Sequence, residues 1–365
     1  MVSIPVFAKD FSVDWLNEVL APHLGNNLVV SCSARDSDIP GQTAAIVLID
    51  VEYRDAAPTL PGQMVAKITS RDPVVLEQVI ANYDQYRRET SFYREFPDCG
   101  IPAPRCLYSD HKPETQEMVI LMADLAPSIS PSWAASTEQV RMALSKLPGL
   151  HSKWWNDELL RSKDWMVQFD NRAFFGAVYN AAHRGKDALD HHFDTPELTQ
   201  SIMAFLAENL DLMLKFTASR PFTFVHGDYH AKQMFFPSSE GGEFAVIDWQ
   251  FPFVAQGAWD FARMISMCLP ADVRRAQERN FLNDYHAGLM DMGVPNYPMH
   301  ELEIDYRMGL IISQAIMVVA ASDTDPAILE KECDDLGLDW KEVMFNRTQY
   351  ALDEWNALGF LKGLR

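Results

Sequence analysis

The sequence predicts an α+β protein with two lobes, a β-rich N-terminal lobe and a mainly helical C-terminal lobe. Three observations lead to this prediction: apolar runs of strand length in the first third of the chain, long amphipathic stretches after residue 124, and one compact strand-and-loop segment among those stretches. A chain of 365 residues is also longer than a single minimal domain needs. We expect the lobes to comprise residues 1–122 and 123–365.

The first third alternates β-branched and apolar runs with turn residues. Strands are predicted at residues 28–32, 44–53, 63–69, 105–109 and 118–122. A helix is predicted from Pro73, a residue that suits a first helical turn, to Phe96, because apolar side chains recur there at helical spacing.

The remainder of the chain has mostly helical periodicity. Helices are predicted at residues 137–155, 171–183, 196–216, 271–292 and 299–321. The segment 222–249, between the third and fourth of these helices, combines short apolar runs with turn residues. The longest apolar run, 308–321, is shorter than the roughly 20 residues that cross a bilayer, so we interpret it as a buried helix and expect no membrane partner.

Composition narrows the class of protein. The formal net charge of −20 argues against a nucleic-acid-binding surface, because phosphate backbones require clustered Lys and Arg. The five cysteines form no CxxC pair, and residues 1–16 carry neither a basic leader nor an uninterrupted apolar run. We therefore expect no signal peptide and a reducing, cytoplasmic setting.

Two aspartates stand out in the segment 222–249. Asp228 lies in the run FVHGDYHAKQ, and Asp248, 20 residues later, lies in FAVIDWQ. The interval between them contains apolar residues and then the turn formers 237–242, which predicts a hairpin. A hairpin returns the chain to its starting point, so both carboxylates can face one cleft.

Phosphoryl transfer requires such a pair of carboxylates. One of them accepts or orients the proton of the attacking hydroxyl, and the other holds Mg²⁺ against the nucleotide phosphates. An isolated HGD or IDW could equally cap a turn and end a strand. The two segments in this order and at this spacing favour the functional interpretation.

The run HGDYHAKQ, followed by VIDWQ and GAWDFA, resembles the aminoglycoside phosphotransferase and choline kinase superfamily, which has the protein-kinase-like fold. The aromatic residue and glutamine after Asp248 are similar to the ecdysteroid-kinase-like branch. The likeness is strongest over residues 224–264. It implies that Asp228 is the catalytic base and Asp248 the main magnesium ligand. It also implies that His226 braces the catalytic loop and that Asp260 holds this loop from the following helix.

One residue departs from the family pattern. The family has an asparagine five residues after the catalytic aspartate, where it binds a second magnesium, and this chain has Gln233. A glutamine amide oxygen can also bind a hard cation, but it lies one methylene further from the backbone. Either the loop adjusts and Gln233 is a metal ligand, or the second metal site is weakened.

The N-terminal lobe contains residues that suit a nucleotide. Lys67 lies in the apolar strand MVAKI, which resembles the VAIK strand of kinases, and Glu89 follows 22 residues later in the predicted helix. A Lys67–Glu89 pair would hold the lysine against the first two phosphates. Gly41 and Thr43, before the strand 44–53, are candidates for a phosphate-covering loop.

The resemblance implies ATP and Mg²⁺ as cofactors and a small-molecule hydroxyl compound as phosphoryl acceptor, which the sequence does not identify. Two alternatives stay open. A nucleotide-binding pseudokinase is suggested by Gln233. A metal-dependent hydrolase is suggested by the HxDxH string of His226, Asp228 and His230, which resembles a set of metal ligands.

Overall fold

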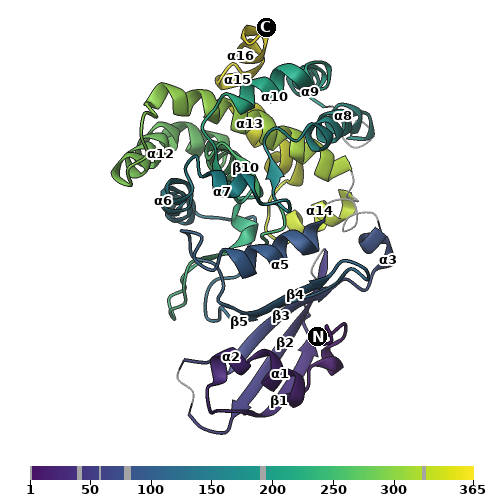
Figure 1. Ribbon diagram of the computed structural model, residues 1–365. Coiled ribbons are helices and arrows are strands. Elements are labelled where there is room, and N and C mark those ends of the chain that lie inside the picture. The colour runs from purple at the N-terminus through teal and green to yellow at the C-terminus, as the bar shows by residue number, and fades with distance from the viewer. Residues whose placement is uncertain (1, 39–42, 57–58, 78–83, 190–194, 323–325) are drawn as a thin grey trace. The chain divides into compact units, whose positions relative to one another are not determined.

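The computed structural model describes residues 2–38, 43–56, 59–77, 84–189, 195–322 and 326–365. These residues form two compact units (Figure 1). The first unit comprises residues 1–129 and 235–251, and the second comprises residues 130–234 and 252–365. The segment 235–251, which carries Asp248, therefore packs with the N-terminal residues.

The first unit is built on a five-stranded antiparallel sheet with the strand order β1-β2-β3-β5-β4. The strands are β1 (Val29–Asp36), β2 (Ala44–Tyr53), β3 (Gln63–Thr69), β4 (Cys106–Lys112) and β5 (Glu117–Ala123). The helical segments are η1 (Ala8–Asp10), α1 (Val13–Val19), α2 (Ala21–Leu24), α3 (Pro73–Val75) and α5 (Gln85–Glu95). All five predicted strands are present, and three of them are longer than expected.

Alternation along the central strand β3 assigns the two faces of this sheet. Ala66 and Ile68 pack in a hydrophobic core with Trp15 and Leu16 of α1. Lys67 points to the opposite face because successive strand residues alternate, and it contacts Glu89 of α5. Helices α1 and α5 thus cover opposite faces, and a charged residue reaches the α5 side.

The predicted helix from Pro73 to Phe96 is not continuous. The described part contains α3 and α5, and Asp84 has a left-handed backbone with φ of 51°. An α-helix does not continue through a left-handed residue. The predicted helix is present in the second half of the segment as α5, but apolar periodicity alone does not reveal a break of this kind.

The second unit is mainly helical. Its helical segments are α6 (Thr137–Lys153), α7 (Glu158–Arg161), α8 (Arg172–Leu189), α9 (Glu197–Glu208), α10 (Leu210–Ala218), η3 (Ala231–Gln233), α11 (Ala258–Cys268), α12 (Ala271–Asp291), α13 (Met299–Ser322), α14 (Pro326–Asp334), η4 (Glu342–Asn346), α15 (Arg347–Glu354) and α16 (Ala357–Gly363). A small sheet pairs β6 (Val167–Gln168), β10 (Phe253–Ala255) and β7 (Thr223–Val225) in that order. The predicted hairpin after Asp228 is present as the two-stranded pair of β8 (Met234–Phe235) and β9 (Ala245–Val246), and its residues from 235 onward belong to the first unit.

Helix α11 is the centre of this unit. All eleven of its residues are buried, and it packs against α6, α12, α13 and α15. Helix α13 is long and apolar enough to cross a membrane, but 72% of its most apolar 18-residue window is buried inside the protein. This burial is that of a core helix, as the sequence predicted for residues 308–321.

Close contact between α11 and α13 depends on Gly309. A Cβ atom at this position would lie 2.7 Å from the carbonyl oxygen of Ala258 and 2.8 Å from Cβ of Ala262. We expect Gly309→Ala to lower the free energy of unfolding by about 1–3 kcal/mol, because backbone atoms of a buried helix would have to move. Urea unfolding followed by circular dichroism measures the change.

Gly363→Ala is the matched control. This glycine is also helical, and a Cβ there meets no atom within 4 Å, so the higher helix propensity of alanine should leave stability equal or raise it by up to about 1 kcal/mol. Equal effects of the two substitutions would contradict the importance of the α11–α13 approach.

Candidate functional site

The first unit contains a buried cluster of charges at Lys67. Its Nζ atom donates to Oε1 of Glu89 at 3.0 Å and to Oδ1 of Asp248 at 2.5 Å. Lys67 is 6% exposed and Glu89 is 1% exposed, whereas the side chain of Asp248 is 29% exposed. The predicted Lys67–Glu89 pair is therefore present, and the same lysine also binds the second predicted aspartate.

Burial is the main influence on the pKa of Glu89. It raises the pKa of Glu89 to about 7, an effect that the positive charge of Lys67 opposes and that Asp248 reinforces. Burial by itself lowers the pKa of Lys67, but the two carboxylates more than compensate, so the net pKa is raised. Lys67 stays charged near neutral pH, and its positive charge is shared between two acidic partners.

The residues around Asp248 each hold the loop in a different way. Asp248 has a left-handed backbone with φ of 61°, which aspartate tolerates better than most residues. The ring of Trp249 is fully buried, stacks on Phe92 of α5 with centroids 4.0 Å apart, and donates from Nε1 to the carbonyl of Val246. Gln250 donates from Nε2 to Oδ1 of Asp248 at 3.2 Å. The sequence Asp-Trp-Gln thus orients, anchors and supports one carboxylate.

The loop predicted to cover phosphates is connected to this cluster through Thr43. Its hydroxyl donates to Oε1 of Gln250 at 3.2 Å, and its carbonyl accepts from the hydroxyl of Tyr86 at 2.6 Å. Gly41 lies outside the residues that the structure describes. The role of both residues in binding phosphate stays a prediction.

In the second unit, hydrogen bonds to the backbone of the two residues before Asp228 hold the start of its loop. The carboxylate of Asp260, on α11, accepts the backbone N–H of His226 at 2.7 Å and that of Gly227 at 2.9 Å. Gly227 has φ of 82°, so the turn before Asp228 uses a conformation that favours glycine. Nε2 of His151 lies 3.4 Å from the same carboxylate. This geometry agrees with the loop-holding role that the resemblance implies for Asp260.

The carboxylate of Asp228 is surrounded by three donors. Arg263 contacts Oδ1 with Nε, at 2.8 Å, and with Nη2. Nε2 of His230 lies 3.2 Å from the same oxygen, and Nε2 of Gln233 donates to Oδ2 at 3.0 Å. These contacts come from α11, from the loop itself and from η3, so the side chain is held from several directions.

The charges near Asp228 favour its ionised form. Burial alone would raise the pKa of Asp228, but Arg263 and the hydrogen-bond donors hold it well below its usual range. Burial lowers the pKa of His230, and this outweighs the attraction of Asp228. We therefore regard His230 as a neutral hydrogen-bonding residue and Arg263 as the counter-charge of Asp228.

Gln233, which the sequence predicts as a metal ligand, lies beside Asp228. Its amide nitrogen is directed at Asp228, and it belongs to the second unit, whereas Asp248 belongs to the first. Its carbonyl oxygen is the atom that a metal would use. The role of Gln233 as a ligand stays a prediction.

The HxDxH string does not form a metal-ligand set. His226 is fully buried, and its Nδ1 accepts from the backbone N–H of Asp228 at 3.2 Å. Within residues 2–38, 43–56, 59–77, 84–189, 195–322 and 326–365, no three His, Cys, Asp or Glu side chains are arranged to hold a metal ion. The geometry of this loop does not favour the hydrolase alternative.

Sequence reasoning missed Arg263 and the supporting role of Gln250. A signal for Arg263 was available, because it lies three residues after Asp260 and residues at this spacing share one face of a helix. Gln250 was noticed only as part of the family resemblance. Its two hydrogen bonds depend on the conformation of the loop and could not be read from spacing.

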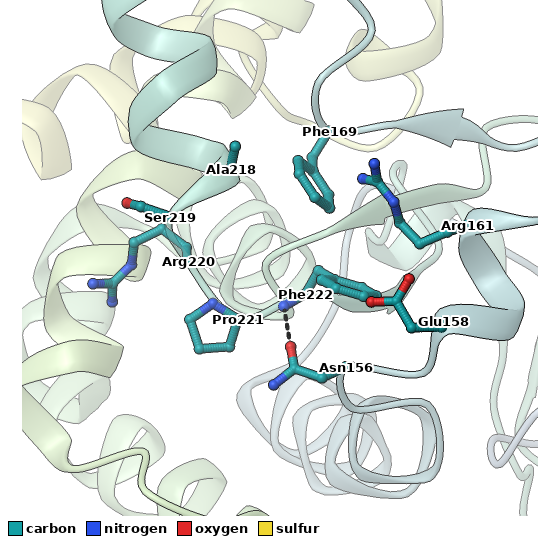
Figure 2. A pocket seen from close by; sticks show the side chains of 9 residues that line it. All are labelled: Asn156, Glu158, Arg161, Phe169, Ala218, Ser219, Arg220, Pro221 and Phe222. Atoms are coloured by element: carbon teal, nitrogen blue, oxygen red, sulfur yellow. Dashed lines mark hydrogen bonds between the residues drawn. The ribbon is translucent and has the colours of Figure 1, made fainter.

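A depression of about 560 Å³ lies in the second unit, apart from the predicted site residues (Figure 2). Phe169 and Phe222 form its aromatic part, Glu158 and Arg161 lie on one side, and Arg220 lies on the other with its guanidinium turned away (Figure 2). It is close to the N-terminal end of β7, whereas the loop with Asp228 follows the C-terminal end. None of the predicted site residues lines it.

These features define a kinase-like phosphotransferase fold, and comparison with known proteins is consistent with this class. A family model described as ecdysteroid kinase-like matches residues 43–293, and the chain belongs to that family. A search among curated proteins found no match. The predicted family resemblance and fold class are thereby confirmed.

One solved structure supports the fold, and a second is given for comparison. A protein from Ralstonia eutropha JMP134 with a provisional assignment as an aminoglycoside phosphotransferase is 13% identical, with a TM-score of 0.53, and the alignment covers 97% of this chain and 99% of that one. Choline kinase from Streptococcus pneumoniae is 12% identical, with a TM-score of 0.47, and the alignment covers 96% and 98%. At 13% identity, the likeness to the first of these structures concerns the fold alone.

The protonation of Glu89 can be tested through stability. Its pKa is about 7 in the folded protein and 4.5 is the ordinary value, so between these values the native state binds a proton that the unfolded state releases. The contribution of Glu89 to stability therefore rises as pH falls from 8 to 5, by up to roughly 3 kcal/mol. Lys67 adds no slope in this range, because it is charged in both states.

The measurement is the difference in free energy of unfolding between the unmodified protein and Glu89→Gln, determined by urea titration at several pH values. Glu95→Gln, on the exposed side of α5, is the control. A difference that shrinks as pH falls would show that the attraction of Lys67 outweighs burial.

The contact between Arg263 and Asp228 should be strongly coupled. We expect Arg263→Met to be destabilising, because it leaves the carboxylate of Asp228, which is only 19% exposed, without its counter-charge. In a double-mutant cycle with Asp228→Asn, the coupling energy should be about 1–3 kcal/mol. Arg172 and Asp211, an exposed ion pair of the same unit, should show no measurable coupling. A negligible value for the buried pair would contradict its role in holding Asp228.

Proposed function

We propose that the protein is an ATP-dependent phosphotransferase that moves the γ-phosphoryl group to a hydroxyl of a small molecule. The observation that carries this proposal is the buried cluster of Lys67, Glu89 and Asp248. A lysine that is kept charged in the interior, with one fully buried carboxylate and one partly exposed one, suits the binding of anionic phosphates. Membership of a kinase-like family supports the same conclusion.

In this proposal Glu89 holds Lys67 in place and Lys67 binds the first two phosphates of ATP. Asp248 is the residue suited to Mg²⁺, because magnesium prefers carboxylate oxygens and this side chain is partly exposed. When bound, the ion neutralises phosphate charge. Gln250 restricts the orientation of the carboxylate, and Thr43 is a candidate donor to phosphate.

Asp228 would receive the acceptor. Because its pKa is held well below the ordinary range, it is ionised at neutral pH and accepts a hydrogen bond from the attacking hydroxyl. A carboxylate of low basicity is better suited to orienting this hydroxyl than to removing its proton before transfer. The proton would pass to Asp228 or to the phosphoryl oxygens as the new P–O bond forms and the bond to ADP breaks.

The setting of this activity is expected to be the cytoplasm. The five cysteines are free thiols, which agrees with a reducing compartment. The proposed acceptor is a small hydroxyl compound, and the net charge of −20 makes nucleic acid an unsuitable partner.

A nucleotide-binding pseudokinase is the second candidate. One observation favours it: the carboxylate of Asp228 already contacts Arg263, His230 and Gln233. If these contacts persist when ligands bind, Asp228 has little capacity to accept an acceptor hydroxyl. The two candidates share nucleotide binding and differ in turnover.

Nucleotide binding and turnover are tested separately. Mg-ATP should raise the melting temperature, since a ligand at about 100 times its Kd adds roughly 2.7 kcal/mol of stability. Lys67→Met should lose this effect, whereas Lys112→Met, a partly exposed control on β4, should retain it. ADP formation across a library of hydroxyl compounds then measures turnover.

Asp228→Asn should retain the Mg-ATP stabilisation and lower turnover at least about 100-fold. The absence of any Mg-ATP effect in the unmodified protein would contradict the nucleotide proposal. Stabilisation without ADP formation from any compound would favour the pseudokinase.

A further inference from the structure

Arg263 has a nitrogen that its contact with Asp228 does not use. Nε and Nη2 face Asp228, and Nη1 is buried with no hydrogen-bond partner among the residues that the structure covers. Arg263 as a whole is 5% exposed. A guanidinium offers five N–H donors and cannot lose its charge in a protein. The Nη1 group of Arg263 is therefore more stable when a hydrogen-bond acceptor lies next to it.

A small cavity of the second unit adjoins this arginine. It is lined by Gly227, Phe253, Trp259, Arg263, Gly309, Ile312, Ser313 and Ile316. Trp259 and Ser313 resemble Arg263 in one respect: indole Nε1 and hydroxyl Oγ are both buried without a partner in the described part of the chain. Trp259 is 6% exposed and Ser313 is 2% exposed. Three of the lining residues thus carry an unused donor.

The chemistry of the lining selects the occupant. Buried polar groups are almost always paired, and an unpaired donor is unfavourable. No carboxylate is present among the eight lining residues, so an ammonium group would meet a guanidinium without an anion to compensate. An oxygen atom with free lone pairs is the kind of group that can accept hydrogen bonds from such donors.

The dimensions restrict how much of a molecule can enter. The cavity has a volume of about 10 Å³, which suits roughly one oxygen atom. Helices α11 and α13 form the walls, and their spacing at Gly309 is already at contact distance. The occupant is therefore one oxygen at the tip of a larger molecule, or a water molecule in its absence.

The position of the cavity connects it with the proposed reaction. Gly227 precedes Asp228 in the chain, and Arg263 contacts both the cavity and the carboxylate of Asp228. We propose that Arg263, Trp259 and Ser313 form a subsite for one hydrogen-bond-accepting oxygen of the phosphoryl acceptor. The inference rests on the proposed function. It makes the acceptor a compound with a carbonyl, carboxylate, ether or second hydroxyl oxygen near the reacting hydroxyl, and not one with an ammonium group there.

The first test uses formate as the probe and needs no nucleotide. Sodium formate should raise the melting temperature saturably relative to sodium chloride at equal ionic strength, and ammonium chloride should not. Ser313→Ala and Trp259→Phe each remove one donor, so the Kd for formate should rise about tenfold in each variant. Ser266→Ala, a buried serine of α11 that bonds Thr348 and does not line the cavity, should leave it unchanged.

A saturable formate effect that is weakened in both variants supports the subsite. No formate effect in the unmodified protein, or an equal effect in all variants, overturns it, and the first result would mean that the cavity holds water only. Because Mg-ATP is absent, these outcomes do not depend on whether the protein proves to be a kinase.

The second test assigns the oxygen to the acceptor. With a hydroxyl compound that supports ADP formation, Ser313→Ala should raise KM about tenfold and leave kcat within a few-fold, since the Ser313 hydroxyl has no hydrogen bond to Asp228. Unchanged KM together with a weakened formate effect would show that the cavity binds small oxyanions but not the acceptor, which overturns the proposal.

Discussion

The buried carboxylate of Asp260 is the constraint on which the second unit depends. It lies on a helix that is buried along its whole length, and it accepts the backbone N–H groups of His226 and Gly227. A buried carboxylate is stable only with such partners. The loop before Asp228 therefore has one favourable position relative to α11. This position also restricts where the side chain of Asp228 can lie.

The charged clusters of the two units have opposite compositions. In the first, one lysine faces two carboxylates, and burial leaves Glu89 with a raised pKa. In the second, one carboxylate faces an arginine, a histidine and an amide, and its pKa is lowered. The two carboxylates hold the lysine and leave Asp248 partly exposed where the proposed function places a cation, whereas the donors around Asp228 keep that carboxylate ionised. Each arrangement fits the role proposed for its unit.

Much of the fold could be predicted because it depends on local patterns. The five strands of the sheet and the long helices α6, α8, α12 and α13 follow from apolar periodicity. The break at Asp84 and the division of residues 196–216 into α9 and α10 could not be predicted, because single backbone residues decide them. The helix α11 was inferred only through family resemblance, and the burial of its whole length, Asp260 and Arg263 included, depends on the helices packed around it.

The sequence by itself determined the family and the residue types of the site. The motifs HGD and IDW and the strand lysine are short and contiguous, so their chemistry can be inferred without the tertiary structure. It did not determine which groups meet. Asp248 binds Lys67 across 181 positions, and Arg263 reaches Asp228 across 35. Only the tertiary structure brought these charges together and buried them. The physical reason is that pairing and desolvation depend on distances in space, which spacing along a chain does not specify.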